Sequence, residues 1–135
     1  MHLLATARFV LGTSLLTTLV ACSTVSAAGG GGVRSIDDGQ EFSMEIGERV
    51  MLADRANLRY IGVANDSRCM PDVQCIWAGD AEVQFEWSMG DATRTFSLHT
   101  GKDPKQQTLG ERRLALVSLA RGDAPEVHLR IERSP

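Results

Sequence analysis

The chain has no long stretch of basic residues. Its formal net charge is −3, from 14 Lys and Arg against 17 Asp and Glu. Basic residues occur close together at Arg112 and Arg113 and again at Arg130 and Arg133, but acidic residues lie among them. Without a continuous positive surface, a protein cannot displace many counterions from a phosphate backbone. The composition therefore argues against a nucleic-acid partner.

Histidine is scarce as well, which limits acid–base chemistry. Apart from His2, the chain has only His99, at the end of a predicted strand, and His128, on the polar side of another. Covalent catalysis needs a nucleophile beside a base, and glycoside hydrolysis needs paired carboxylates at a cleft. The sequence shows neither pattern. We expect both histidines to be solvated, and we predict no catalytic residue and no enzymatic activity.

The longest apolar run is too short to cross a bilayer. It covers residues 9–20 and follows Arg8 and the free amino terminus. About 12 residues of helix reach only about 18 Å, whereas the hydrocarbon layer is about 30 Å thick. A short apolar run behind a positive charge is typical of a cleaved secretory signal. We therefore predict a signal peptide over Met1–Ala21.

The end of this segment has the pattern of a lipoprotein cleavage site. Leu19, Val20 and Ala21 precede Cys22, an order that resembles the bacterial lipobox. The resemblance implies that the Cys22 thiol carries diacylglycerol and that the new amino terminus is acylated too. Two acyl chains already anchor stably, so three would anchor permanently. The alternative is an ordinary signal peptide cut near Ala27, with Cys22 incidental.

The residues after Cys22 indicate a destination and a tether. Ser23, by resemblance to the Gram-negative sorting pattern, favours the outer membrane, with the domain facing the periplasm. Residues 22–34 are mostly small or polar and include four consecutive glycines at 29–32. Such a segment has little to bury, so it is expected to act as a flexible tether. A single folded domain is then expected over residues 35–135.

The predicted domain shows no sustained run of apolar residues at helical spacing. Apolar and polar residues instead alternate along most of it, with a period of two. Strands are predicted within residues 42–52, 58–63, 75–87, 93–98, 113–119 and 127–131. Gly47–Glu48 interrupts the first of these as a turn or a bulge. Residues 113–119 are apolar at both parities, which predicts a central strand covered on both faces, and residues 100–110 are expected to form a polar loop. The fold class is therefore all-β, a small antiparallel sandwich of six to eight strands or alternatively a small barrel.

Residues 65–79 hold the most specific local pattern. Once Cys22 is assigned to lipid, Cys69 and Cys75 are the remaining cysteines, in an exported domain where thiols are oxidised. We predict a disulfide between them, which should stabilise the fold by about 2 kcal/mol. Trp77 has the parity of Cys75 and is expected to pack near the sulfurs, over the start of the core.

Other residues of this segment form a possible binding loop. Asp66 is expected to cap the loop backbone, and Arg68 to pair with an acidic neighbour such as Asp72 or Asp80. The predicted loop surface consists of Asp66, Ser67, Arg68, Asp72, Trp77 and Gly79.

A metal site using the two cysteines with Asp66, Met70, Asp72 or a histidine is an alternative for this segment. A second cysteine pair and a Cys-x-x-Cys motif are both missing from the sequence. We therefore expect neither a metal nor a cofactor.

This segment resembles the signature of a family of small, uncharacterised bacterial lipoproteins. The matching positions are Asp66 to Cys69, Val73, Cys75 and Trp77 to Gly79. The resemblance is tight over residues 66–79 and looser over the succession of lipobox, linker and strand-rich domain. In the family pattern Pro follows the first cysteine directly, whereas here Met70 intervenes before Pro71. The resemblance implies a lipoprotein and no particular activity.

These features together predict a lipid-anchored, non-catalytic envelope protein that acts as a binding or structural module, with an envelope protein as its partner. One alternative is a periplasmic metal-handling or thiol-active protein that uses Cys69 and Cys75. Another is an inhibitor of a secreted hydrolase, a role compatible with a small sandwich.

Overall fold

The computed structural model describes residues 32–135. The predicted signal peptide, Cys22 and most of the predicted tether lie outside the described residues. Within residues 32–135 the chain forms strands and no helix, so this part contains no helix long and apolar enough to cross a membrane.

The strands follow one another along the chain with short connections, except for one long loop between the two longest strands. They are β1 (Arg34–Ile36), β2 (Glu41–Met44), β3 (Arg49–Leu52), β4 (Asn57–Asp66), β5 (Ala81–Met89), β6 (Ala92–His99), β7 (Gln106–Leu109), β8 (Arg112–Leu119) and β9 (Val127–Arg133).

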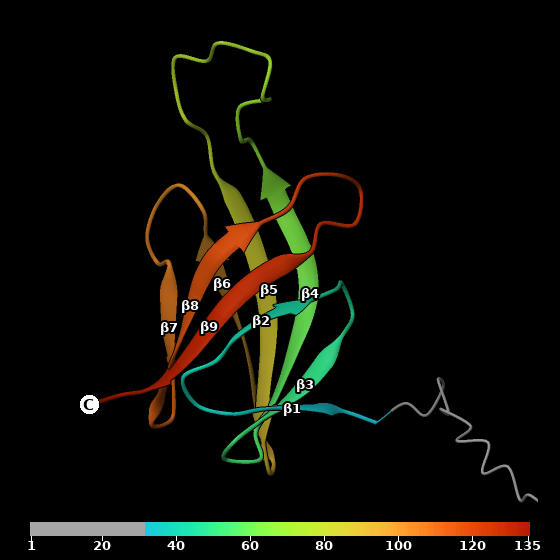
Figure 1. The fold of residues 1–135 in the computed structure, drawn as a ribbon, viewed down its shortest axis with the longest axis vertical. Coiled ribbons are helices and arrows are strands. Elements are labelled where there is room, and N and C mark those ends of the chain that lie inside the picture. Colours follow the sequence, from blue (N-terminus) through green and yellow to red (C-terminus); the bar gives the residue numbers. More distant parts are fainter. Residues whose placement is uncertain (1–31) are drawn as a thin grey trace, which may run out of the picture. The chain divides into compact units, whose positions relative to one another are not determined.

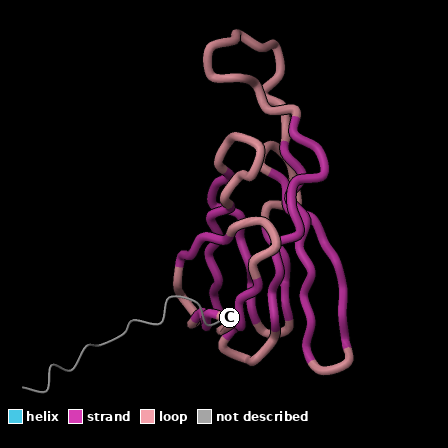
Figure 2. Tube along the Cα trace, turned by 90° about the vertical axis from the view of Figure 1, so that its right-hand side faces the viewer, coloured by secondary structure: helices cyan, strands magenta, loops and turns pink. Residues whose placement is uncertain are grey.

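Two sheets pack face to face as a sandwich (Figures 1 and 2). One has the strand order β1-β3-β4-β5-β6 and the other the order β2-β9-β8-β7. All neighbouring strands are antiparallel except β1 and β3. Neither sheet closes on itself, so the prediction of an all-β sandwich is confirmed and the barrel alternative is wrong.

The core lies between the sheets and consists of the alternate side chains that each strand turns inward. Tyr60 on β4 and Phe85 on β5 are fully buried, with ring centroids 5.6 Å apart. The buried Tyr60 hydroxyl donates a hydrogen bond of 2.9 Å to the carbonyl oxygen of Pro125. Burial raises the pKa of Tyr60 above its ordinary value, although the nearby positive charge of Arg68 opposes this. The hydroxyl therefore stays a neutral donor that joins the two sheets.

The first predicted strand is in fact two strands in different sheets. β2 pairs with β9 and β3 pairs with β4, and the turn between them contains Gly47 with φ +85°. Phe42, Met44 and Val50 are all buried as predicted, because both sheets face the same core. Ile46, predicted inward, is exposed because it lies in the turn.

The prediction that β8 is covered on both faces is wrong, although β8 does lie between two strands. Its burial alternates only from Arg112 to Leu114, and Val117 is 52% exposed. The pairing of β8 with β9 shifts register between Leu116 and Ser118. A bulge changes which parity faces the core. Leu114 and Leu119 are therefore both buried although their parities differ.

Two short strands lie where none was predicted. β7 falls within the predicted polar loop of residues 100–110, and β1 begins at the end of the predicted tether. In neither segment does the sequence alternate between apolar and polar residues over enough positions to predict a strand.

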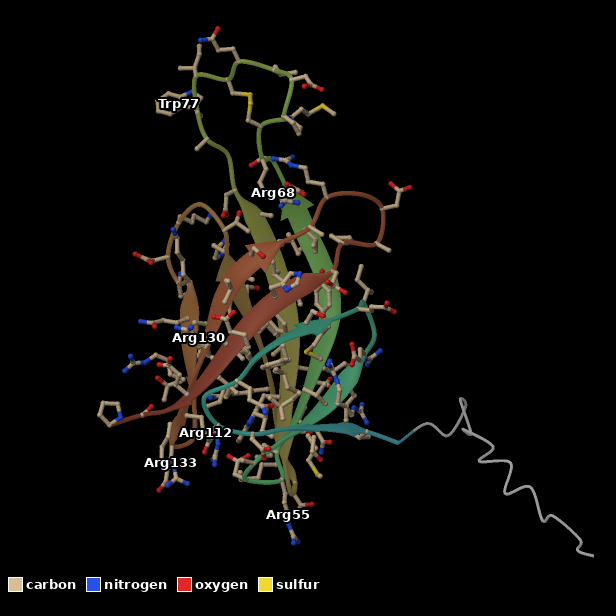
Figure 3. The ribbon with its side chains drawn as sticks, viewed as in Figure 1. Arg55, Arg68, Trp77, Arg112, Arg130 and Arg133 are labelled. Carbon is tan, nitrogen blue, oxygen red and sulfur yellow. A yellow bond between two sulfur atoms is a disulfide. The ribbon has the colours of Figure 1, made fainter. Side chains whose placement is uncertain are left out.

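A buried ion-pair cluster joins the two sheets at one end of the sandwich. Arg112 on β8, labelled in Figure 3, lies 2.6 Å from Asp38 and 3.0 Å from Asp54, measured from its Nε and Nη1 atoms. The pKa of Arg112 is raised above its ordinary value, and the largest cause is its hydrogen bond to Asp38. Asp38 precedes β2 and Asp54 follows β3, so one guanidinium holds three segments together.

Candidate functional site

The most prominent surface feature is a loop that extends beyond both sheets. β4 and β5 pair along most of their length, and residues 67–80 connect them as a long projection (Figures 1 and 2). We call residues 67–80 the cross-linked loop. It contains five of the six predicted binding residues, all except Asp66.

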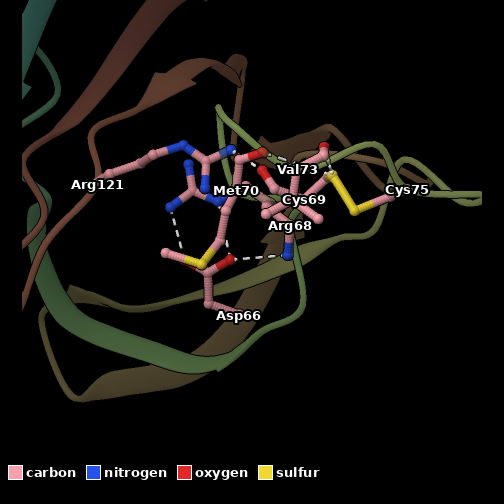
Figure 4. The surroundings of a disulfide bond; sticks show 7 residues. All are labelled: Asp66, Arg68, Cys69, Met70, Val73, Cys75 and Arg121. Atoms are coloured by element: carbon pink, nitrogen blue, oxygen red, sulfur yellow. Dashed lines mark hydrogen bonds and ion pairs between the residues drawn. A yellow bond between two sulfur atoms is a disulfide. The ribbon is translucent and has the colours of Figure 1, made fainter.

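A disulfide closes the outer part of the loop. Cys69 and Cys75 are bonded, with their Cα atoms 6.0 Å apart (Figure 4), and the predicted disulfide is confirmed. Inside the ring, the Val73 N–H donates a hydrogen bond of 3.1 Å to the Met70 carbonyl oxygen. Both sulfurs are bonded to each other, so neither is a thiolate able to bind a metal in this state. Within the described residues, no three His, Cys, Asp or Glu side chains form a group suited to a metal ion.

The base of the loop is held by one backbone and one side-chain hydrogen bond that follow directly on the β4–β5 pairing. The Ser67 N–H donates to the Asp80 carbonyl oxygen at 2.7 Å, and the Ser67 hydroxyl accepts from the Asp80 N–H at 3.1 Å. Gly79 has φ +71°, and a Cβ there would lie 2.0 Å from the Ser67 carbonyl oxygen. Only glycine fits this position, so Ser67 and Gly79 together hold the base of the loop.

Arg68 fastens the loop to the opposite sheet. Its guanidinium forms a two-pronged pair with Asp66, with Nε 2.9 Å from Oδ1 and Nη2 2.6 Å from Oδ2. It also donates to the carbonyl oxygens of Leu119 and Ala120, at 2.7 and 2.9 Å. The predicted pairing of Arg68 with Asp72 or Asp80 is therefore wrong, because Asp66, the last residue of β4, lies only two residues away along the chain.

Asp66 itself acts as predicted. Its Oδ1 accepts a hydrogen bond of 3.1 Å from the Arg68 backbone N–H, which caps the start of the loop. The hydrogen bond from the Arg68 side chain lowers the pKa of Asp66 below its ordinary value. The carboxylate therefore stays ionised and paired over the physiological range.

A second tie runs from the loop between β8 and β9. The Arg121 guanidinium donates a hydrogen bond of 2.6 Å to the Cys69 carbonyl oxygen (Figure 4). The cystine ring is therefore linked to the body of the sandwich directly, and not only through the strands that precede and follow the loop.

The other side of the loop base contains an Asp–His pair. Asp80 Oδ2 lies 2.6 Å from His99 Nδ1, and Oδ1 accepts a hydrogen bond of 2.8 Å from the Gly101 N–H. Burial by itself would raise the pKa of Asp80, but the Gly101 N–H and His99 outweigh it and the pKa is lowered. His99 is largely buried, so the prediction that it is solvated is wrong, because β6 ends beside Asp80.

An aspartate paired with a histidine supplies two of the three members of a catalytic triad, and a hydroxyl at the histidine would complete it. Among the described residues, no serine or threonine hydroxyl is hydrogen-bonded to His99. The pair instead orients Asp80, whose backbone closes the loop. His128 lies at the surface with Glu126 3.0 Å away, in agreement with its predicted exposure.

The tip of the loop is apolar and exposed. Met70 is 67% exposed, Val73 54%, Ile76 92% and Trp77 82%, and Figure 3 shows Trp77 far from the sheets. The predicted packing of Trp77 against the core is wrong. Strand β5 begins at Ala81 rather than at Cys75. Trp77 therefore lies outside the sheet, and the alternation that it shares with the core residues of β5 does not turn it toward the core.

Asp72 is the one predicted site residue that lies at the tip with a free charge. It is exposed, and no partner lies within ion-pair distance among the described residues. The tip thus presents one carboxylate beside four apolar side chains.

The structure separates the six predicted site residues into two groups. Asp66, Ser67, Arg68 and Gly79 build the base, whereas Asp72 and Trp77 are available at the tip. Ile76 was not among the predicted binding residues. Cys75, Ile76 and Trp77 are apolar at consecutive positions, which signals that they do not follow the alternation of a strand.

Comparisons of the chain with family models, curated proteins and solved structures find no match. The lipoprotein-family resemblance stays a prediction.

Proposed function

We propose that this chain is a lipid-anchored, non-catalytic binding module that recognises an envelope protein through the tip of the cross-linked loop. The observation that carries the proposal is the contrast within that loop. Its base is fastened by the contacts of Arg68, Arg121 and Asp80, whereas its tip leaves Ile76 and Trp77 almost fully in water.

Exposed apolar side chains gathered at one place are typical of interaction surfaces. Tryptophan is enriched among the residues that contribute most to protein–protein affinity. A loop held in one conformation before binding loses less entropy when the complex forms. The disulfide and the base contacts therefore favour recognition by the tip.

The position of the loop supports a partner that lies away from the point where the chain enters the domain. In Figure 1, β1, the first strand, lies near the end of the sandwich remote from the cross-linked loop. If Cys22 is lipidated as predicted, residues 22–34 connect the membrane to that remote end. The tip can then face away from the membrane that holds the anchor.

The proposal is tested by photo-crosslinking in cells that make the full chain. A photoreactive residue at position 77 should capture a discrete protein, and one at position 117 should not. Val117 is a matched control because it is an exposed apolar residue on the body of the sandwich.

Affinity for the captured protein then tests the role of the tip. We expect Trp77→Ala to weaken binding at least about tenfold, since truncating a central aromatic contact typically costs 2 kcal/mol or more. Val117→Ala should leave binding unchanged. Equal capture from both positions, or unchanged binding by Trp77→Ala, would show that the tip is not the recognition surface.

The anchor is tested separately. Substituting Cys22→Ser should move the protein from the membrane fraction to the soluble fraction, because the acyl chains are lost. A mature protein that begins beyond position 22, or that has the mass of an unmodified polypeptide, would contradict lipidation.

Inhibition of a secreted hydrolase is a second candidate function. It is favoured by the narrow, projecting form of the cross-linked loop, because enzyme sites are concave and mostly apolar. The captured protein distinguishes the two functions: a hydrolase whose activity falls on addition of this chain supports inhibition, and a protein without a hydrolytic site supports recognition alone.

A further inference from the structure

The two sheets have four edge strands, and three of them are short. β1 has three residues, and β2 and β7 have four each. β6 is the fourth edge and has eight residues. An unpaired strand presents a row of free N–H and C=O groups, and short edge strands are one way in which proteins prevent pairing with other chains. β6 lacks this protection.

β6 also lacks the other common protective features. It contains no Lys and no Pro, and its pairing with β5 runs without a register shift. Its one arginine, Arg94, is turned away from the edge. The Arg94 guanidinium lies 5.1 Å from the Trp87 ring centroid and donates a hydrogen bond of 2.7 Å to the Thr108 carbonyl oxygen. The open side of β6 is therefore an edge without a Lys, a Pro or a bulge.

The hydrogen bonds at the end of β6 show which residues face the open edge. The Thr100 N–H donates to Ala81 at the start of β5, whereas the His99 N–H points the other way and donates to Pro104. Backbone groups alternate sides along a strand. Thr93, Thr95 and Ser97 therefore turn their N–H and C=O groups outward, and none of these groups has a backbone partner among the described residues.

We infer that this edge pairs with β6 of a second copy of the chain, antiparallel and with the two-fold axis at Thr95. The turn after Met89 ends the open edge on one side, and the Pro104 contact at His99 ends it on the other. The three outward residues between these limits are centred on Thr95. A two-fold axis at Thr95 places Thr93 of each copy opposite Ser97 of the other, so the three pairs can each exchange two hydrogen bonds.

The side chains of this edge favour a second copy because the same surface is complementary to itself, as a two-fold interface requires. In this register threonine faces threonine or serine, and Arg94 faces Phe96 of the second copy. No like charges come opposite each other. The two five-stranded sheets would then continue as one sheet across the axis. The inference does not depend on the function proposed for the cross-linked loop.

Single cysteine substitutions test the register in cells that make the full chain. Residues opposite each other in a hydrogen-bonded pair have Cα atoms about 5.5 Å apart, within the range that a disulfide bridges. Thr95→Cys should therefore give a covalent dimer on a non-reducing gel after mild oxidation. Thr93→Cys is the matched control, because the two copies of position 93 would lie roughly 14 Å apart along the strands.

Coexpression of Thr93→Cys with Ser97→Cys sharpens the test, because these positions face each other and should cross-link only when both are present. A dimer from Thr93→Cys alone that equals the one from Thr95→Cys would overturn the inference, and so would absence of the Thr95→Cys dimer. A Thr95→Cys adduct of another mass would also overturn it, since the edge would then bind a different chain.

A variant that blocks the edge provides a second readout. Thr95→Pro removes an outward N–H that the fold itself does not use, so the dimer should dissociate in sedimentation equilibrium of the detergent-solubilised protein. Thr95→Ala retains the N–H and should remain dimeric. Circular dichroism of both variants checks that the strands are retained, and a dimeric, folded Thr95→Pro protein would contradict the proposed pairing.

Discussion

The body of the sandwich and the cross-linked loop use apolar residues in opposite ways. In the body, side chains such as Leu58 and Phe85 are completely buried between the sheets. In the loop, Ile76 and Trp77 have no such cover, and order comes from a disulfide and from the polar contacts of the base. Within residues 32–135 the body and the cross-linked loop therefore have different sources of stability, so each should respond to different perturbations.

Truncation of an apolar side chain should separate the two regions most clearly. We expect Leu58→Ala to lower the free energy of unfolding by about 2–5 kcal/mol, because it leaves a cavity in a fully buried site. Ile76→Ala should change it by less than about 0.5 kcal/mol, because the side chain is already in water. Urea unfolding of the two variants measures the difference. Similar losses would mean that the loop tip packs against the body.

Ion pairs should show the same contrast between buried and exposed positions. Arg112→Met leaves Asp38 and Asp54 without their shared cation in a largely buried site, and we expect a loss of about 3 kcal/mol. Arg130→Met is the matched control. Arg130 pairs with Glu41 at 2.7 Å, but both side chains are about half exposed, so a loss of at most about 1 kcal/mol is expected. Thermal unfolding of both variants tests this order.

Removal of the disulfide should affect the loop more than the core. Replacing Cys69 and Cys75 together by serine should lower the free energy of unfolding by about 2 kcal/mol, since a short closed ring no longer restricts the unfolded chain. Hydrogen exchange should increase at the Val73 amide, whereas amides in the middle of β5 keep their relative protection. Loss of cooperative unfolding in this variant would show that the sandwich depends on the loop.

Acid should loosen the base of the cross-linked loop, and we expect the smallest change in stability of the four perturbations. The folded-state pKa values of Asp66 and Asp80 lie below the ordinary value of 3.8. Each carboxylate therefore stabilises the fold above that pH, and this contribution is lost as the pH falls through the lower, folded-state value. Hydrogen exchange at the Arg68 and Gly101 amides should increase over that interval relative to the intrinsic rate, before the core opens.

Variants that cannot ionise provide the control for this pH dependence. Asp66→Asn should remove the acid-induced change at the Arg68 amide, and Asp80→Asn should remove it at the Gly101 amide. A variant that retains the full acid response would show that another group controls the loop base.

The sequence predicted those parts of the structure that depend on local pattern. Alternation identified the inward residues of β5 and β9, because a half-buried strand needs apolar residues at every second position. Cysteine counting identified the disulfide, because two cysteines a few residues apart in a domain predicted to be exported have few other partners. Asp66 was predicted as a cap on the same local grounds.

The errors arose where a local pattern continued past the end of an element. Trp77 is separated from the core residues of β5 by an even number of positions, but it precedes the strand. Alternation therefore says nothing about which way its side chain points. In β8 the register shifts after Leu116, so core residues occupy odd positions on one side of the shift and even positions on the other. This pattern of apolar residues was interpreted as a strand buried on both faces. The alternation of residues alone does not reveal where hydrogen-bonded pairing stops or shifts.

The sequence alone determined that the domain predicted over residues 35–135 is all-β, which residues of most strands face the core, and that Cys69 bonds to Cys75, because each depends on neighbours along the chain. Only the tertiary structure decided that Arg68 and Arg121 fasten the loop, that His99 holds Asp80, and that Trp77 stands in solvent. Those outcomes depend on segments far apart in the sequence, such as the β8–β9 loop and the end of β6, and their proximity follows from how the sheets pack.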